Sequence, residues 1–148
     1  KYLGKKINKN SVLNPLYIYS LENVTPRIFS ADKLITTKNS YTDKKFYAEL
    51  NNLDFLDALA SKEDAIENYN IYFQNKLEID EVIFSEKNVI VELRKLEDGF
   101  LVFNQVFTPK WSARCGDKNI KVIPVNGIMM GVLLKKRDLC KTVVFKYD

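Results

Sequence analysis

Histidine is absent from this chain of 148 residues. Its absence removes the commonest general base, so neither a Ser-His nor a Cys-His nucleophile can be built. The five glycines match neither a phosphate-binding loop nor a dinucleotide-binding fingerprint. The sequence therefore predicts a domain that has no catalytic residue of its own and binds no cofactor.

Cysteine is scarce, and the chain contains only two, Cys115 and Cys140. Two distant cysteines without a histidine cannot complete a structural zinc site, so we expect no metal. The pair leaves two interpretations open. The thiols can form a disulfide in an oxidising compartment, or they can remain unpaired and half-buried.

Long apolar runs are also missing. The longest, Ile128 to Leu134, has seven residues, whereas a helix that spans a bilayer needs about 18. The chain starts on a lysine-rich stretch without an initiating methionine. We therefore expect a folded domain outside the bilayer that was cut from a longer protein.

The composition that remains is that of a folded protein, with 46% hydrophobic, 12% aromatic and 28% charged residues. The net charge of +4 is explained by lysines 1, 5, 6 and 9, because the rest of the chain has 23 − 4 = 19 basic residues against 19 acids. The sequence thus predicts a basic tail over residues 1–15 and a single domain over residues 16–148. A neutral domain is an unlikely partner for nucleic acid.

Short strands between turn-forming clusters dominate from Tyr69 onward, a pattern typical of antiparallel sandwiches and barrels. Asn126-Gly127 predicts a tight hairpin, because both residues tolerate positive φ. Further strands are expected at residues 16–21, 27–29 and 34–37. The spacing of Leu53, Leu56 and Leu59 predicts a helix near residues 51–60. The predicted fold class is mostly β, an antiparallel β-sandwich of jelly-roll or Ig-like type with one or two short helices.

Two residue types were considered as a source of function. The carboxylates Glu78 and Asp80 fall on one polar strand face, the ordinary arrangement of solvated side chains rather than an acid/base pair. Aromatic residues can stack on sugar rings or pack in a core, and both interpretations stay open. The candidates for glycan contacts are Tyr17, Tyr19, Tyr69, Tyr72 and Trp111. For Trp111 we expect a largely buried side chain.

A resemblance to a known family rests on motifs in the last fifty residues and a weaker stretch upstream. These are an apolar strand ending at Phe107 before a Pro and Trp turn, a short hairpin, an Asn-Gly turn and a closing strand ending in Tyr147. The motif residues are Arg27, Pro109, Trp111, Asp117, Asn126 and Gly127. In this pattern the chain resembles the C-terminal soluble region of YfhO-type bacterial membrane proteins, although Lys110 stands where the family has glycine.

Proteins of that family are similar to glycosyltransferases that use polyprenyl-phosphate sugars, with the chemistry in their membrane part. The resemblance implies a non-catalytic accessory domain on the extracytoplasmic face, membrane-anchored through the parent protein, that shapes or recognises a cell-surface glycan acceptor. Its partners would be the transmembrane portion of the same polypeptide and a glycan or lipid-linked glycan. Two alternatives stay open: a purely structural or protein-interaction domain, and a free-standing carbohydrate-binding module.

Overall fold

Strands form most of the computed structural model, which describes residues 26–54, 56–62 and 69–148. In chain order the elements are β1 (Ile28–Ala31), β2 (Lys33–Thr37), α1 (Lys44–Leu50), β3 (Asp57–Ser61), β4 (Asn70–Tyr72), β5 (Ile79–Phe84), β6 (Asn88–Leu93), β7 (Gly99–Phe103), β8 (Trp111–Cys115), β9 (Lys118–Ile120), β10 (Ile123–Val125), β11 (Met129–Leu134), the 3₁₀ helix η1 (Lys136–Asp138) and β12 (Thr142–Tyr147). The expected basic tail and the expected strand at residues 16–21 lie outside the described residues.

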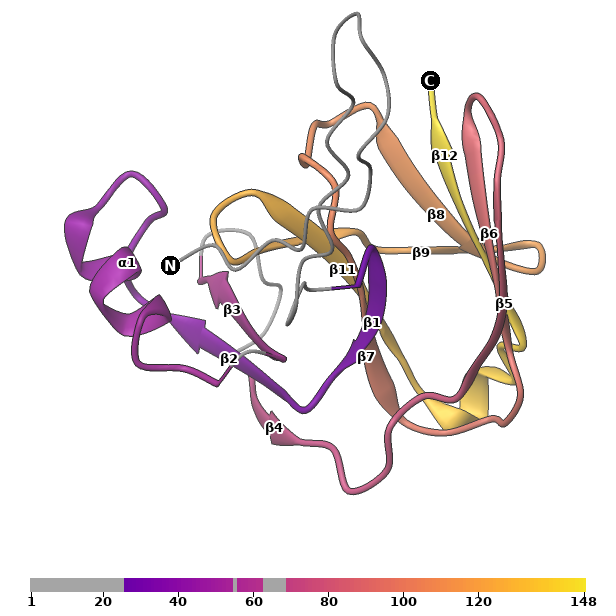
Figure 1. Ribbon diagram of the computed structural model, residues 1–148, viewed down its shortest axis with the longest axis horizontal. Helices are drawn as coiled ribbons and strands as arrows, with labels where there is room; N and C mark the ends of the chain where they lie inside the picture. Colours follow the sequence, from indigo (N-terminus) through magenta and orange to yellow (C-terminus); the bar gives the residue numbers. More distant parts are fainter. Residues whose placement is uncertain (1–25, 55, 63–68) are drawn as a thin grey trace, which may run out of the picture.

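Three sheets are stacked in layers (Figure 1). The central sheet has the order β1-β7-β11-β10, and the five-stranded sheet on one side of it has the order β5-β6-β12-β8-β9. On its other side lies the three-stranded sheet, β3-β2-β4, with α1 at its outer end. The predicted mostly β class and sandwich packing are confirmed. The third layer was not predicted.

Strand β7 shows why the central sheet is apolar on both faces. Leu101 and Phe103 pack against the five-stranded sheet, whereas Phe100 and Val102 pack against the three-stranded sheet. All five residues of β7 are buried. A strand covered on both sides has no polar face, which explains the uninterrupted apolar run in its sequence.

The five-stranded sheet follows the alternation expected of a half-exposed sheet. On β6, Val89, Val91 and Leu93 are buried and the residues between them are half-buried. On β12, Val143 and Phe145 point into the same core. Each strand therefore contributes one apolar face to the sandwich, as its sequence predicted.

The predicted helix near residues 51–60 is wrong. The helix α1 lies earlier in the chain and is capped by Asp43, whose carboxylate accepts from the Lys45 backbone N–H at 2.9 Å. Within the expected range, β3 is a strand with every residue buried, paired in parallel with β2. A strand buried on both faces does not alternate, so its apolar residues can imitate helical spacing. The connection between these parallel strands carries α1, because such strands need a crossover.

Among the described residues, none of the helices has both the length and the hydropathy that crossing a bilayer requires.

Candidate binding groove

A groove of about 420 Å³ lies at one end of the sandwich, between the central sheet and the five-stranded sheet. Its walls come from the residue before β1, the β5–β6 turn, the loop after β7, the start of β8 and the end of β12. The aromatic residues that line it are Phe84, Phe103, Trp111 and Tyr147. We call it the Trp111 groove. Its volume lies in the range of small-ligand sites.

Trp111 anchors this groove and is half-buried, so the expectation of a largely buried side chain is met only in part. Its ring packs edge-on against Phe103, with 5.4 Å between the ring centroids, and lies 5.1 Å from the Tyr147 ring. Trp111 and Tyr147 are opposite one another on β8 and β12. The neighbouring strands thus hold the two rings as a cross-strand pair.

The turn before β8 places Trp111 at the groove. The Trp111 backbone N–H donates to the Thr108 carbonyl oxygen at 3.0 Å, and Pro109 follows Thr108. Proline suits the second position of such a turn because its φ is fixed. The Thr108 hydroxyl is buried without a hydrogen-bond partner, the one such side-chain atom in the described part of the chain. Thr108 also lines the groove.

Arg27 also lines the groove, and its side chain is exposed. The central carbon of its guanidinium lies 4.4 Å from the Phe84 ring centroid and 5.8 Å from that of Phe103. Its Nη2 donates to Gln105 Oε1 at 3.4 Å, a long hydrogen bond. The cation therefore lies over an aromatic surface, and the described residues give it one further, long hydrogen bond.

The two predicted glycan-contact tyrosines that the structure describes, Tyr69 and Tyr72, lie in different environments. Tyr69 is 9% exposed and packs in the core between the central and three-stranded sheets, whereas Tyr72 is 69% exposed on β4. Tyr72 lines a second groove of about 430 Å³, and the Lys33 ammonium lies 4.9 Å from its ring centroid. Tyr17 and Tyr19 lie outside the described residues.

The motif residues divide into two sets. Arg27 and Trp111 line the groove, and Pro109 belongs to the turn that leads to it. Asp117 is an exposed residue of the β8–β9 turn. Asn126 and Gly127 form the predicted hairpin turn between β10 and β11, with φ of 53° and 81°.

Phe84, Gln105 and Tyr147 are among the groove residues that sequence reasoning missed. Phe84 and Tyr147 are the last residues of β5 and β12. Several strand ends meet at one end of a sandwich, so terminal aromatic residues were the signal that could have indicated the groove. To recognise this signal one must know which strands pair with one another, and strand pairing is not a local property of the sequence.

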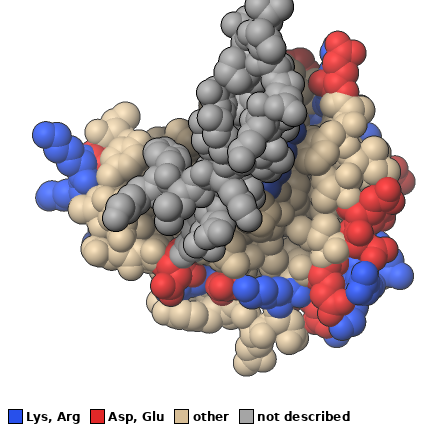
Figure 2. All heavy atoms as spheres, viewed as in Figure 1, with Lys and Arg blue, Asp and Glu red and all other residues tan. Residues whose placement is uncertain are grey.

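Two carboxylates at the start of β5, Glu78 just before the strand and Asp80 on it, are paired with cations. Glu78 forms an ion pair with Lys95 at 2.5 Å, and Asp80 with Arg94 at 2.8 Å. The hydrogen bond from Lys95 lowers the pKa of Glu78. Figure 2 shows acidic and basic side chains interspersed on this side of the molecule. The interpretation of these acids as an ordinary solvated face is supported by this pairing. Among the described residues, no group of three metal-binding side chains occurs.

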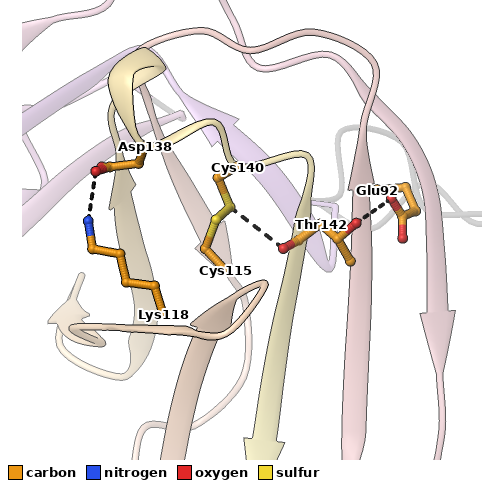
Figure 3. Close-up of a disulfide and its surroundings, with 6 residues drawn as sticks. All are labelled: Glu92, Cys115, Lys118, Asp138, Cys140 and Thr142. Atoms are coloured by element: carbon orange, nitrogen blue, oxygen red, sulfur yellow. Dashed lines mark hydrogen bonds and ion pairs between the residues drawn. A yellow bond between two sulfur atoms is a disulfide. The ribbon is translucent and has the colours of Figure 1, made fainter.

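A disulfide joins Cys115 on β8 to Cys140, just before β12, with 5.5 Å between the Cα atoms (Figure 3). It decides between the two interpretations of the cysteines. Beside it, Lys118 donates to Asp138 at 2.8 Å, and this hydrogen bond lowers the pKa of the Asp138 carboxyl. Strand β8 begins at Trp111 and ends at Cys115. The disulfide therefore lies at the end of β8 that is farther from the Trp111 groove.

Comparison of the chain with protein families, with curated proteins and with solved structures finds no match.

Proposed function

We propose that this chain is a non-catalytic glycan-binding domain that uses the Trp111 groove. The observation that carries the proposal is the grouping of Trp111 and Tyr147 with polar side chains in one hollow of small-ligand size. Aromatic rings offer an apolar surface to the C–H faces of a sugar, and neighbouring polar groups can bind its hydroxyls. Gln105 and Asn88 are such groups in the groove.

The disulfide and the family resemblance both bear on where this domain is located in the cell. Disulfides persist in oxidising compartments and are rare where thiols are kept reduced. Together with the resemblance to YfhO-type proteins, the disulfide supports an accessory role on the extracytoplasmic face of a multi-spanning glycosyltransferase-like protein. The domain would recognise a glycan or lipid-linked glycan for the transmembrane part of the same polypeptide.

A protein-contact role is the second candidate, and a specific observation favours it. Phe84 and Val106 line the same groove and are 45% and 57% exposed. Exposed apolar side chains that lie together often mark contact sites between proteins. The two functions differ in whether soluble glycans bind to the isolated chain.

Trp111 is the only tryptophan of the chain, so its fluorescence reports directly on the groove. We expect titration with bacterial cell-wall polysaccharide fragments to change this fluorescence, with dissociation constants on the order of millimolar, because one or two stacked rings bury little area. An assay for sugar release should detect no turnover.

Tyr147→Ala and Tyr72→Ala form a matched pair, because each removes one tyrosine from a different groove. Tyr147→Ala should abolish the fluorescence change, and Tyr72→Ala should leave it intact. Absence of any response to glycans in the native protein would contradict the proposal and favour the protein-contact role.

A further inference from the structure

Arg27, just before β1, differs from Arg94, just after β6, in how its guanidinium is engaged. Arg94 donates from two nitrogens to the Asp80 carboxylate, at 3.2 and 2.8 Å. Arg27 has no carboxylate within ion-pair distance among the described residues, and its one side-chain hydrogen bond, to Gln105, is long. A guanidinium carries five N–H donors, and within the described part of the chain most of those on Arg27 have no partner.

The Phe84 ring lies close to the guanidinium that carries these donors. With the guanidinium carbon 4.4 Å from the ring centroid, one face of the cation is covered by the aromatic surface. Stacking on a ring leaves the edges of the planar guanidinium available, and those edges match the paired oxygens of a carboxylate or phosphate. Arg27 is therefore prepared for an anion before any ligand arrives.

The charges around the groove favour an anion as well. Lys87 lines the groove, and the Lys110 ammonium lies 5.7 Å from the Tyr147 ring centroid beside it. Glu86 is the one acidic residue in the lining. Asp148, which follows Tyr147, already forms an ion pair with Lys146. Positive charge at the rim attracts anionic ligands and raises their local concentration.

Trp111 and Tyr147 supply the surface for a ring, and the buried Thr108 hydroxyl still lacks a partner. A buried hydroxyl without a partner is unusual in folded proteins and is often explained by a water or ligand that completes the site. From these observations we infer that the Trp111 groove binds an anionic saccharide, a sugar bearing a phosphate or a carboxylate that Arg27 binds. This inference rests on the proposed glycan-binding function.

The test is a fluorescence titration of the full chain with four probes: glucose, glucose 6-phosphate, glucuronate and inorganic phosphate. At least one charged sugar should bind about tenfold or more tightly than glucose, the order expected for a charge-assisted hydrogen-bond pair. Its affinity should fall as the salt concentration rises. Comparison of glucose 6-phosphate with glucuronate shows whether the groove prefers a phosphate or a carboxylate.

Three variants localise the effect. Arg27→Gln should reduce the affinity for the charged sugar to that for glucose, and Arg27→Lys should restore only part of it because the fork is lost. Lys87→Gln, which leaves the stacked guanidinium in place, should weaken binding by a smaller factor. Arg94→Gln is the control, since Arg94 lies outside the groove lining, and it should change nothing.

The outcomes separate this inference from the function on which it rests. Equal affinities for glucose and the charged sugars would overturn the inference and leave the glycan-binding proposal standing. Inorganic phosphate that binds as tightly as glucose 6-phosphate would also overturn it, because the sugar would then contribute nothing. If none of the sugars and no polysaccharide fragment bound, both proposals would fail.

Discussion

Gly131 in β11 shows how closely the central sheet is packed. A Cβ atom at this position would lie 2.5 Å from a ring carbon of Phe100 and 2.7 Å from the Leu101 carbonyl oxygen. The second of these atoms belongs to the backbone of a neighbouring strand and cannot move away cheaply. Any side chain at position 131 therefore forces β7 and β11 apart.

We predict that Gly131→Ala lowers the free energy of unfolding by about 1–3 kcal/mol, the usual cost of overpacking. Urea denaturation measures it. Gly116→Ala is the matched control, since nothing lies within 4 Å of its added Cβ and only the positive φ of 57° is unfavourable. Its cost should be about 1 kcal/mol. A loss at Gly131 no larger than the loss at Gly116 would contradict the close packing of the central sheet, because Gly131 lacks the positive φ that penalises Gly116→Ala.

Single residues also show where sequence reasoning succeeds. The Asn126-Gly127 turn could be predicted because the property that matters, tolerance of positive φ, belongs to the two residues themselves. The half-burial of Trp111 could not, because it depends on Phe103 from another sheet and Tyr147 from another strand. Of the aromatic candidates, Trp111 lines the groove, but the sequence did not indicate which residues lie beside it.

Asn126 also links two elements of the fold. Its side-chain oxygen accepts from the Leu59 N–H at 2.8 Å, and its side-chain nitrogen donates to the Asp57 carbonyl oxygen at 3.1 Å. Its backbone N–H donates to the Leu59 carbonyl oxygen at 2.8 Å. The hairpin turn of the central sheet is thus bonded to β3 of the three-stranded sheet.

We predict that Asn126→Gly lowers the free energy of unfolding by about 1–3 kcal/mol, because it leaves the Leu59 N–H and the Asp57 carbonyl without these partners. Glycine keeps the positive φ, so the turn itself is not strained. Hydrogen exchange should accelerate at the Leu59 amide and stay unchanged at the Val91 amide on β6. Uniform acceleration at both amides would show that Asn126 stabilises the whole molecule rather than the junction between these two sheets.

Elements differed in how well the sequence predicted them. Strands β6 and β12 could be predicted because each has one buried and one more exposed face, which gives a local alternation. Strand β3 could not, because its burial on both sides depends on parallel pairing with β2, across the connection that contains α1. The register of that pairing places Asp57 opposite Lys33, with 3.0 Å between their charged atoms. No local pattern around residue 57 indicates this ion pair.

The whole molecule is organised around the central sheet, and its two outer layers carry different features. The sandwich formed with the five-stranded sheet contains the Trp111 groove and the disulfide. The three-stranded sheet carries the exposed Tyr72 and the second groove. The shape of the Trp111 groove therefore depends on the integrity of the sandwich, to which the disulfide contributes directly.

The last prediction concerns that disulfide. Its cysteines are separated by 25 residues, and closure of a loop of this length lowers the entropy of the unfolded chain enough to stabilise the fold by about 3–4 kcal/mol. This is a large part of the roughly 5–15 kcal/mol that stabilises a typical domain. Reduction should therefore lower the urea midpoint clearly, and the double variant Cys115→Ala/Cys140→Ala should unfold at a low midpoint that reductant does not change. The intact protein should also be two hydrogens lighter before reduction than after it. Two thiols that react freely with an alkylating agent in protein purified under oxidising conditions would contradict the bridge, and would remove the support that it gives to an extracytoplasmic location.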